Sequence, residues 1–190
     1  MKKAACAVCL CILASVLAAG QRVVDRGLTP GPTDIPVQTA TVNANAFLDT
    51  IGQPRPDWTA ATAVLNNYVR GIRTWHLSGP LYRIDVDSTS GKVTSFHNAQ
   101  RIDQLYRGLG RTGAVACSED AAKNLVRRLA TKLGVPADAK VTNWGYRLSG
   151  TGQDNDRCGD FGATFSIDNH PVATIACDIQ DGLPFEIWLK

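Results

Sequence analysis

The sequence predicts an α+β protein made of two units, each a helix packed on an antiparallel sheet, behind an extended N-terminal tether. Three observations indicate this organisation: a helix with clear start and stop signals at 118–136, several short alternating strands separated by turns, and a proline-rich stretch near the start. The chain has 190 residues, of which 44% are hydrophobic and 19% charged. This composition is typical of a globular protein with one ordinary domain or two small ones.

Residues 1–20 have the pattern of a secretory signal peptide. Lys2 and Lys3 form a positive start, an apolar run of 16 residues follows up to Ala19, and small residues precede Gln21. A membrane-spanning helix needs about 20 apolar residues. We therefore expect cleavage before Gln21, the alternative being a retained anchor. The mature protein is then secreted or periplasmic, without stable membrane insertion.

The charge balance argues against nucleic acid as a partner. The whole chain has 20 Lys and Arg against 17 Asp and Glu, a formal net charge of +3. Cleavage removes Lys2 and Lys3 and leaves 18 against 17, or +1. A nucleic-acid-binding protein usually shows a clear basic excess.

The tether and the first unit are predicted from proline content and periodicity. Residues 21–57 hold five of the nine prolines, interleaved with threonine, and predict an extended tether. The first unit covers 58–107. Asp57 caps a predicted helix that ends at Arg73. Strands follow at 75–77, 82–87 and 92–96.

A glycine-rich linker, 108–117, leads to the second unit, 118–190. Ser118 caps its helix, acidic residues occupy the first turn, and Gly134 and Pro136 end it. One face of this helix is apolar and the other is basic, and we expect the basic face to be solvated. The basic residues are Lys123, Arg127, Arg128 and Lys132. Strands are predicted at 141–148, 161–167, 172–177 and 185–189.

A strand that ends in Asp, with a Gly four positions later, occurs twice. The two instances are Asp87 with Gly91 and Asp178 with Gly182. A predicted helix begins 30 residues before the first Asp (57 to 87) and 60 before the second (118 to 178). This pattern indicates an internal repeat whose second copy carries an additional hairpin.

Three cysteines remain after cleavage: Cys117, Cys158 and Cys177. An exported protein meets an oxidising compartment, so at least one disulfide is expected. Three single pairings are open, and we favour Cys158 with Cys177, from a loop and a neighbouring strand. Cys117 precedes a helix and is expected to be a buried, inert thiol, the alternative being a reactive one.

The other candidate sites are weak, and we predict no cofactor and no catalytic residues. Asp154, Asp156 and Asp160 partly fit a calcium loop, but Phe165 stands where a bidentate carboxylate is required. A polar loop is the favoured interpretation, with weak calcium binding left open. The Gly-x-Gly-x-x-Gly run at 108–113 has no strand before it and no helix opening on it. The histidines, His76, His97 and His170, show no zinc spacing.

Large aromatic side chains are candidates for the core or for partner contact. We expect Trp75 and Trp188 in the core, and also Trp144 and Tyr146, which share one face of their strand. Trp58 follows the proline-rich tether, and we expect it to be the most exposed tryptophan and a partner contact.

Two motifs resemble the PepSY domain. They are the helix start Ser-Glu-Asp-Ala-Ala at 118–122 and the hairpin Tyr-Arg-Ile-Asp-Val-Asp-x-x-x-Gly-Lys-Val at 82–93. The resemblance covers about 59–189 in two degenerate copies. It implies a cystatin-like helix-on-sheet fold, export from a bacterium, and a role in protease inhibition or regulation or in envelope processes. It carries over no catalytic residue.

These observations predict an exported, non-enzymatic module that binds another exported protein. The resemblance implies a protease or an envelope factor as the kind of partner, and an edge strand of the sheet could take up a partner segment by strand addition. The alternative is a small-ligand-binding protein or a cofactor-free enzyme with a concave pocket between helix and sheet. That alternative predicts a polar group facing the pocket, from His76, His97, Asp85 or Asp178.

Overall fold

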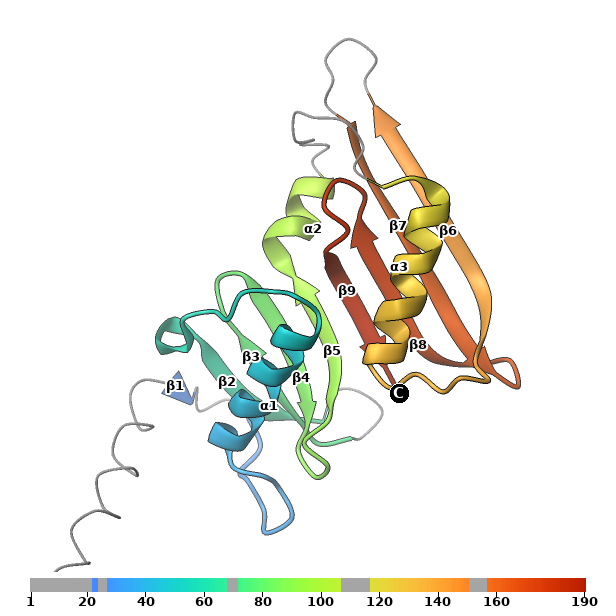
Figure 1. Ribbon diagram of the computed structural model, residues 1–190. Coiled ribbons are helices and arrows are strands. Elements are labelled where there is room, and N and C mark those ends of the chain that lie inside the picture. The colour runs from blue at the N-terminus through green and yellow to red at the C-terminus, as the bar shows by residue number, and fades with distance from the viewer. Residues whose placement is uncertain (1–21, 24–26, 68–71, 107–116, 151–156) are drawn as a thin grey trace, which may run out of the picture.

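The computed structural model describes residues 22–23, 27–67, 72–106, 117–150 and 157–190 (Figure 1). It is an α+β fold, as predicted. The helices are α1 (Val37–Thr50), α2 (Ala99–Tyr106) and α3 (Glu119–Lys132), with a short 3-10 turn, η1 (Trp58–Ala60). The strands are β1 (Arg22–Val23), β2 (Thr62–Asn66), β3 (Thr74–Ser78), β4 (Tyr82–Asp87), β5 (Val93–Asn98), β6 (Lys140–Gly150), β7 (Arg157–Ile167), β8 (His170–Asp178) and β9 (Pro184–Leu189).

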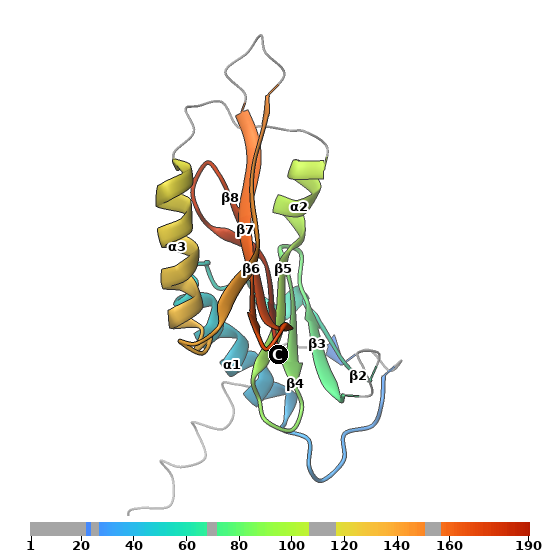
Figure 2. The same ribbon diagram turned by 90° about the vertical axis from the view of Figure 1, so that its right-hand side faces the viewer.

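The strands form one continuous sheet in the order β1-β2-β3-β4-β5-β9-β8-β7-β6. Every pair of neighbouring strands in this order is antiparallel except β1 and β2, which pair in parallel. Helices α1 and α3 lie on one face of this sheet, and α2 lies on the other side (Figure 2). The β5–β9 pair therefore joins two halves of the sheet. The first half consists of β1–β5 with α1 and α2, and the second half consists of β6–β9 with α3.

The proline-rich stretch is not an extended tether, so this prediction was wrong. Its prolines flank α1, which begins directly after Pro36 and ends at Thr50. Between them an apolar face at helical spacing packs on β3, β4 and β5. The buried residues are Val37, Ala40, Ala44, Phe47, Leu48 and Ile51. Proline fits before and after a helix, which is why a helix can stand inside a proline-rich stretch.

A partly buried ion pair between Asp34 and Arg73 ties the stretch before α1 to the sheet. The carboxylate of Asp34, with a side chain 0% exposed, accepts hydrogen bonds from Arg73 Nη2 at 2.6 Å, Ser88 Oγ at 2.5 Å and the backbone N–H of Gly31 at 2.6 Å. The hydrogen bonds from Arg73, with those from Ser88 and Gly31, outweigh burial and hold the pKa of Asp34 well below its ordinary value. This segment is therefore part of the folded protein.

The predicted helix from Asp57 to Arg73 is also wrong. Asp57 does cap a turn, but that turn is η1, and the chain then enters β2. Ala61, Ala63 and Leu65 are buried at alternate positions, which is the period of a strand. The apolar residues of this stretch fit both periods, and pairing with β3 selects the strand.

Helix α3 is confirmed, together with its caps. Ser118 Oγ accepts from the backbone N–H of Ala121, Glu119 and Asp120 occupy the first turn, and Gly134 follows with φ of 75°. The apolar face lies against β7 and β8. Its buried members are Ala122, Val126, Leu129 and Ala130.

The strands after residue 73 are confirmed, and so are their turns. After β4 the backbone N–H of Gly91 donates to the carbonyl of Asp87 at 2.9 Å, and after β8 that of Gly182 donates to Asp178 at 2.8 Å. Both glycines have positive φ, near 70°, where glycine is favoured. Among the described residues four strands lie between α1 and α3 and four follow α3, so the additional hairpin expected for the second half is wrong.

Candidate protein-binding groove

Strand β6 is the last strand of the sheet and has one neighbour, β7. It is 11 residues long, and no strand in the described part of the chain lies on its outer side. A bulge at Thr142 interrupts the pairing near its start, where Thr142 Oγ1 lies 2.8 Å from Ser166 Oγ. From Asn143 onward the pairing with β7 is regular. A long edge strand offers a row of backbone groups that a further strand can pair with.

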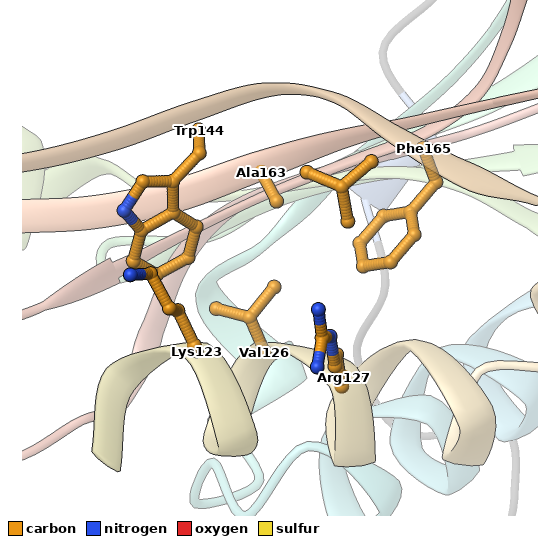
Figure 3. Close-up of a pocket in the computed structure, with 7 residues that line it drawn as sticks. Lys123, Val126, Arg127, Trp144, Ala163 and Phe165 are labelled. Carbon is orange, nitrogen blue, oxygen red and sulfur yellow. The ribbon is translucent and has the colours of Figure 1, made fainter. Parts of the chain in front are cut away.

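An apolar crevice lies beside this edge, between α3 and the sheet (Figure 3). Its volume is about 180 Å³. Val126, Ala163 and Phe165 are nearly fully buried and line its base, whereas Val141 and Trp144 belong to β6 and are more exposed. Lys123 and Arg127 come from α3 and complete the lining. We call the crevice together with the outer edge of β6 the β6 groove.

The crevice exists because α3 is centred on β7 and β8. The helix packs on these two strands and leaves part of β6 on this side uncovered, since Val141 is exposed. Val141 pairs with Phe165 and Trp144 with Ala163, so both point to the same side of the sheet as α3. Val141 is 40% exposed even though it lies on the face that carries the core.

A hydrogen bond to Glu119 fixes the orientation of the Trp144 ring at the crevice. Its indole Nε1 donates to Glu119 Oε1 at 3.1 Å, and the ammonium of Lys123 lies 3.0 Å from the same oxygen and 5.8 Å from the centre of the ring. The hydrogen bonds from Lys123 and Trp144 lower the pKa of Glu119. The charge of Lys123 is thus matched inside the protein, and the ring of Trp144 is fixed as one wall.

Arg127 lies one helical turn after Lys123 and has no carboxylate partner among the described residues. Its side chain is exposed, and no carboxylate in the described part of the chain forms an ion pair or hydrogen bond with its guanidinium. Arg128 and Lys132 extend the basic face along α3. The rim of the crevice is therefore positive on the helix side.

A second cluster of polar side chains lies on the opposite face of the sheet, around Asp85. Its carboxylate accepts from His76 Nδ1 at 2.6 Å and from Ser95 Oγ at 2.7 Å. Burial acts to raise the pKa of Asp85, but the hydrogen bonds from His76 and Ser95 outweigh it and the pKa is lowered. Ser95 is 2% exposed, and its hydroxyl donates a hydrogen bond to Asp85 and not to a histidine. The arrangement therefore differs from a Ser-His-Asp triad, in which histidine stands between the other two.

Trp188 lies on this same face, so its predicted place in the core is wrong. It is 42% exposed, and its ring meets that of His97 edge to face, with ring centroids 4.9 Å apart. Its indole donates to Glu186 at 3.0 Å. Burial lowers the pKa of His97. Trp75 is 2% exposed and is confirmed as a core residue.

Trp58, predicted as the most exposed tryptophan and a partner contact, packs at the margin of the core. It is half-buried, and its Nε1 donates to Asn45 of α1 at 2.8 Å. Trp188 is the more exposed of the two. Trp144 and Tyr146 likewise pack at the core margin, and the Tyr146 hydroxyl donates to the carbonyl of Cys117 at 2.9 Å.

The three cysteines after residue 20, Cys117, Cys158 and Cys177, lie in the second half of the chain. Cys117 and Cys177 are buried free thiols, and burial raises the pKa of both. Cys177 pairs with Phe161 on β7, three residues from Cys158, and this offset does not favour the predicted disulfide. The side chain of Cys158 lies outside the described residues, but Cys177 is a free thiol, so the structure does not support the predicted Cys158–Cys177 disulfide.

Other predicted features fall partly outside the described residues. The described residues do not include the predicted signal peptide, the glycine-rich run at 108–113, Asp154 or Asp156. Asp160 lies within β7, opposite Asp178, and not in a loop. Among the described residues no group of three or more metal-ligating side chains could hold a metal ion. None of the helices described is long and apolar enough to span a membrane.

Comparison with known proteins shows no family model, curated protein or solved structure that matches this chain.

Proposed function

We propose that this chain is an exported, non-enzymatic module that binds another protein by taking up an extended segment of it in the β6 groove. The observation that carries the proposal is an 11-residue edge strand with one neighbour, directly beside an apolar crevice. In strand addition the backbone of the bound segment supplies affinity, and a pocket for alternate side chains supplies specificity. The β6 groove offers both.

The other end of the sheet supports this proposal. Strand β2 occupies the corresponding edge, and there the chain covers itself. Arg22 and Val23 pair in parallel with β2, and the backbone N–H of Leu28 donates to the carbonyl of Leu65 at 2.7 Å. A segment of the protein thus already adds to the sheet at β2, and β6 offers the same kind of edge to a partner.

The two ends correspond if the fold is a tandem of two related helix-plus-sheet units. In support, α1 precedes β2–β5 and α3 precedes β6–β9, and the strand order is symmetric about the β5–β9 pair. The matching turns after β4 and β8 agree with this interpretation. We propose that each of the two units is one copy of a PepSY-like domain with a cystatin-like helix-on-sheet form. Together with the predicted signal peptide, the resemblance supports an exported partner, with a protease as the favoured class.

Affinity capture with groove variants tests the proposal. The purified exported protein serves as bait against envelope and secreted extract of the cells that make it. Val141→Glu places a charge on the exposed wall of the crevice, and Val42→Glu changes another exposed valine, 55% exposed on α1, as the matched control. We expect a protein that the wild type and Val42→Glu retain and Val141→Glu loses. Equal retention by all three baits contradicts binding in the groove.

A second candidate function is a small-ligand binder that uses the crevice alone. The crevice lies between helix and sheet, as that alternative requires, but it is smaller than the 300–1,000 Å³ typical of small-molecule sites. None of His76, His97, Asp85 and Asp178 lines it. A small-molecule adduct in the native mass spectrum of the wild type, absent from Val141→Glu, favours this candidate over a protein partner.

A further inference from the structure

We infer that the β6 groove selects segments in which an apolar side chain is accompanied, two residues away, by Asp or Glu. This inference rests on the proposed function and adds the chemical class of the segment. It depends on three features of the groove: the size of the crevice, the unmatched charge of Arg127 and the spacing that an added strand imposes.

The size and lining of the crevice fit one apolar side chain. Its volume of about 180 Å³ is bounded by Val126, Ala163 and Phe165, which are 1%, 5% and 5% exposed, and by the ring of Trp144. An apolar group that enters displaces water from this surface, which is favourable in proportion to the apolar area covered. A charged group would lose its hydration there without a buried partner.

The rim selects a carboxylate. Lys123 already faces Glu119 at 3.0 Å, so the guanidinium of Arg127 is the cation on the rim that lacks an anion among the described residues. A guanidinium presents planar donors that match a carboxylate in a two-point hydrogen bond. An acidic segment is therefore the complementary occupant.

Strand geometry fixes the spacing between the two side chains. In a strand that adds to β6, alternate residues point to the α3 side and the others point to the opposite face. Residues that share a side lie about 6.6 Å apart, at about 3.3 Å per residue. Lys123 and Arg127 are themselves one helical turn apart, about 6 Å. Figure 3 shows Lys123 under Trp144 and Arg127 toward the Phe165 end of the crevice. An apolar side chain in the crevice thus places the acid two positions away beside Arg127.

Selection from a display library of random 12-residue peptides tests this inference, with the purified exported protein as target. We expect enriched peptides to share an apolar residue and Asp or Glu two positions apart. Arg127→Glu should replace the acid in this pattern with Lys or Arg, and should weaken a peptide selected on the wild type about 10- to 100-fold, the range for a hydrogen bond to a charged group. Arg128→Glu, the adjacent cation that does not line the crevice, is the matched control and should keep the acidic pattern.

The outcomes separate the specificity from the function. Enriched peptides without an acid at that spacing, or the same pattern from Arg127→Glu as from the wild type, overturn the inference and leave the proposed function standing. Enrichment of no peptide at all overturns both. Single N-methylation along a selected peptide adds an independent test, because strand addition predicts loss of binding at alternate positions. Uniform tolerance of N-methylation contradicts pairing with β6.

Discussion

Leu48→Ala tests whether the proline-rich stretch belongs to the folded core. Leu48 lies in α1, is 0% exposed, and belongs to the same hydrophobic cluster as β3, β4 and β5 residues. The substitution removes three carbons, about 0.8 kcal/mol each for transfer from water, or about 2.4 kcal/mol. The cavity that remains adds to this, and buried Leu→Ala changes cost about 2.7–5 kcal/mol. We therefore expect the free energy of unfolding to fall by about 3 kcal/mol.

Urea unfolding followed by tryptophan fluorescence measures this change. Val42→Ala is the matched control, since Val42 lies in the same helix and is 55% exposed. It should change the free energy of unfolding by no more than about 0.5 kcal/mol. If Leu48→Ala is as mild as Val42→Ala, then α1 does not pack on the sheet and the description of residues 27–57 as part of the fold fails.

Three further predictions concern stability and thiol chemistry. Because the pKa of Asp34 is depressed in the folded protein, its ion pair stabilises the fold above the ordinary carboxyl pKa near 3.8, and this contribution is lost as the pH falls below that value. Urea unfolding should therefore show that Asp34→Asn is less stable than the wild type at pH 7 and loses less stability than the wild type between pH 7 and pH 2. Parallel pH profiles of the two free energies of unfolding contradict this. Gly162→Ala would bring a Cβ to 2.5 Å from the carbonyl of Ile175 and should destabilise by about 1–3 kcal/mol, whereas Gly145→Ala on the paired strand meets open space and should have little effect on the melting temperature; equal effects of the two would refute the close approach of β7 to β8. Cys177 should resist iodoacetamide in the folded protein at pH 8 and react after unfolding, because burial raises its pKa, and peptide mass spectrometry after both treatments gives the answer; rapid labelling of the native protein would show that this part of β8 is open.

The second half of the fold, together with β4 and β5 of the first half, was predictable because the local signals agree with one another. Ser118, the acidic first turn and Gly134 mark both ends of α3, and its 3.6-residue period is unbroken. The strands from 82 onward alternate clearly, with Asp, Asn and Gly at the turns. Where capping, period and turn chemistry all agree, tertiary contacts have little to override.

Residues 27–66 of the first half were mispredicted because their local signals conflict. Proline content outweighed the apolar spacing from Val37 to Ile51, although that spacing was visible in the sequence. Between residues 61 and 65 helix and strand periods were both satisfied, and only pairing with β3 decides between them. The burial of Asp34 depends on Arg73, 39 residues away, a contact that no local pattern announces.

The sequence predicted the type of binding site, an edge strand or a pocket between helix and sheet, but not its position beside β6. Edge strands and a pocket between helix and sheet were expected from the fold class, and the basic face of α3 was visible but was interpreted as solvated. Its position beside β6 depends on α3 packing over β7 and β8, a tertiary arrangement that the local sequence pattern does not specify.

Hydrogen exchange of the β6 backbone, with and without a bound partner segment, tests the central claim most directly. The claim is that a partner segment adds to the sheet as a further strand. We predict that alternate amides between Asn143 and Gly150 become protected on binding, because every second N–H of an edge strand points outward. The amides of β2, at the other end of the sheet, should be unchanged. Unaltered exchange along β6 while the segment is bound, or protection elsewhere in its place, contradicts the account.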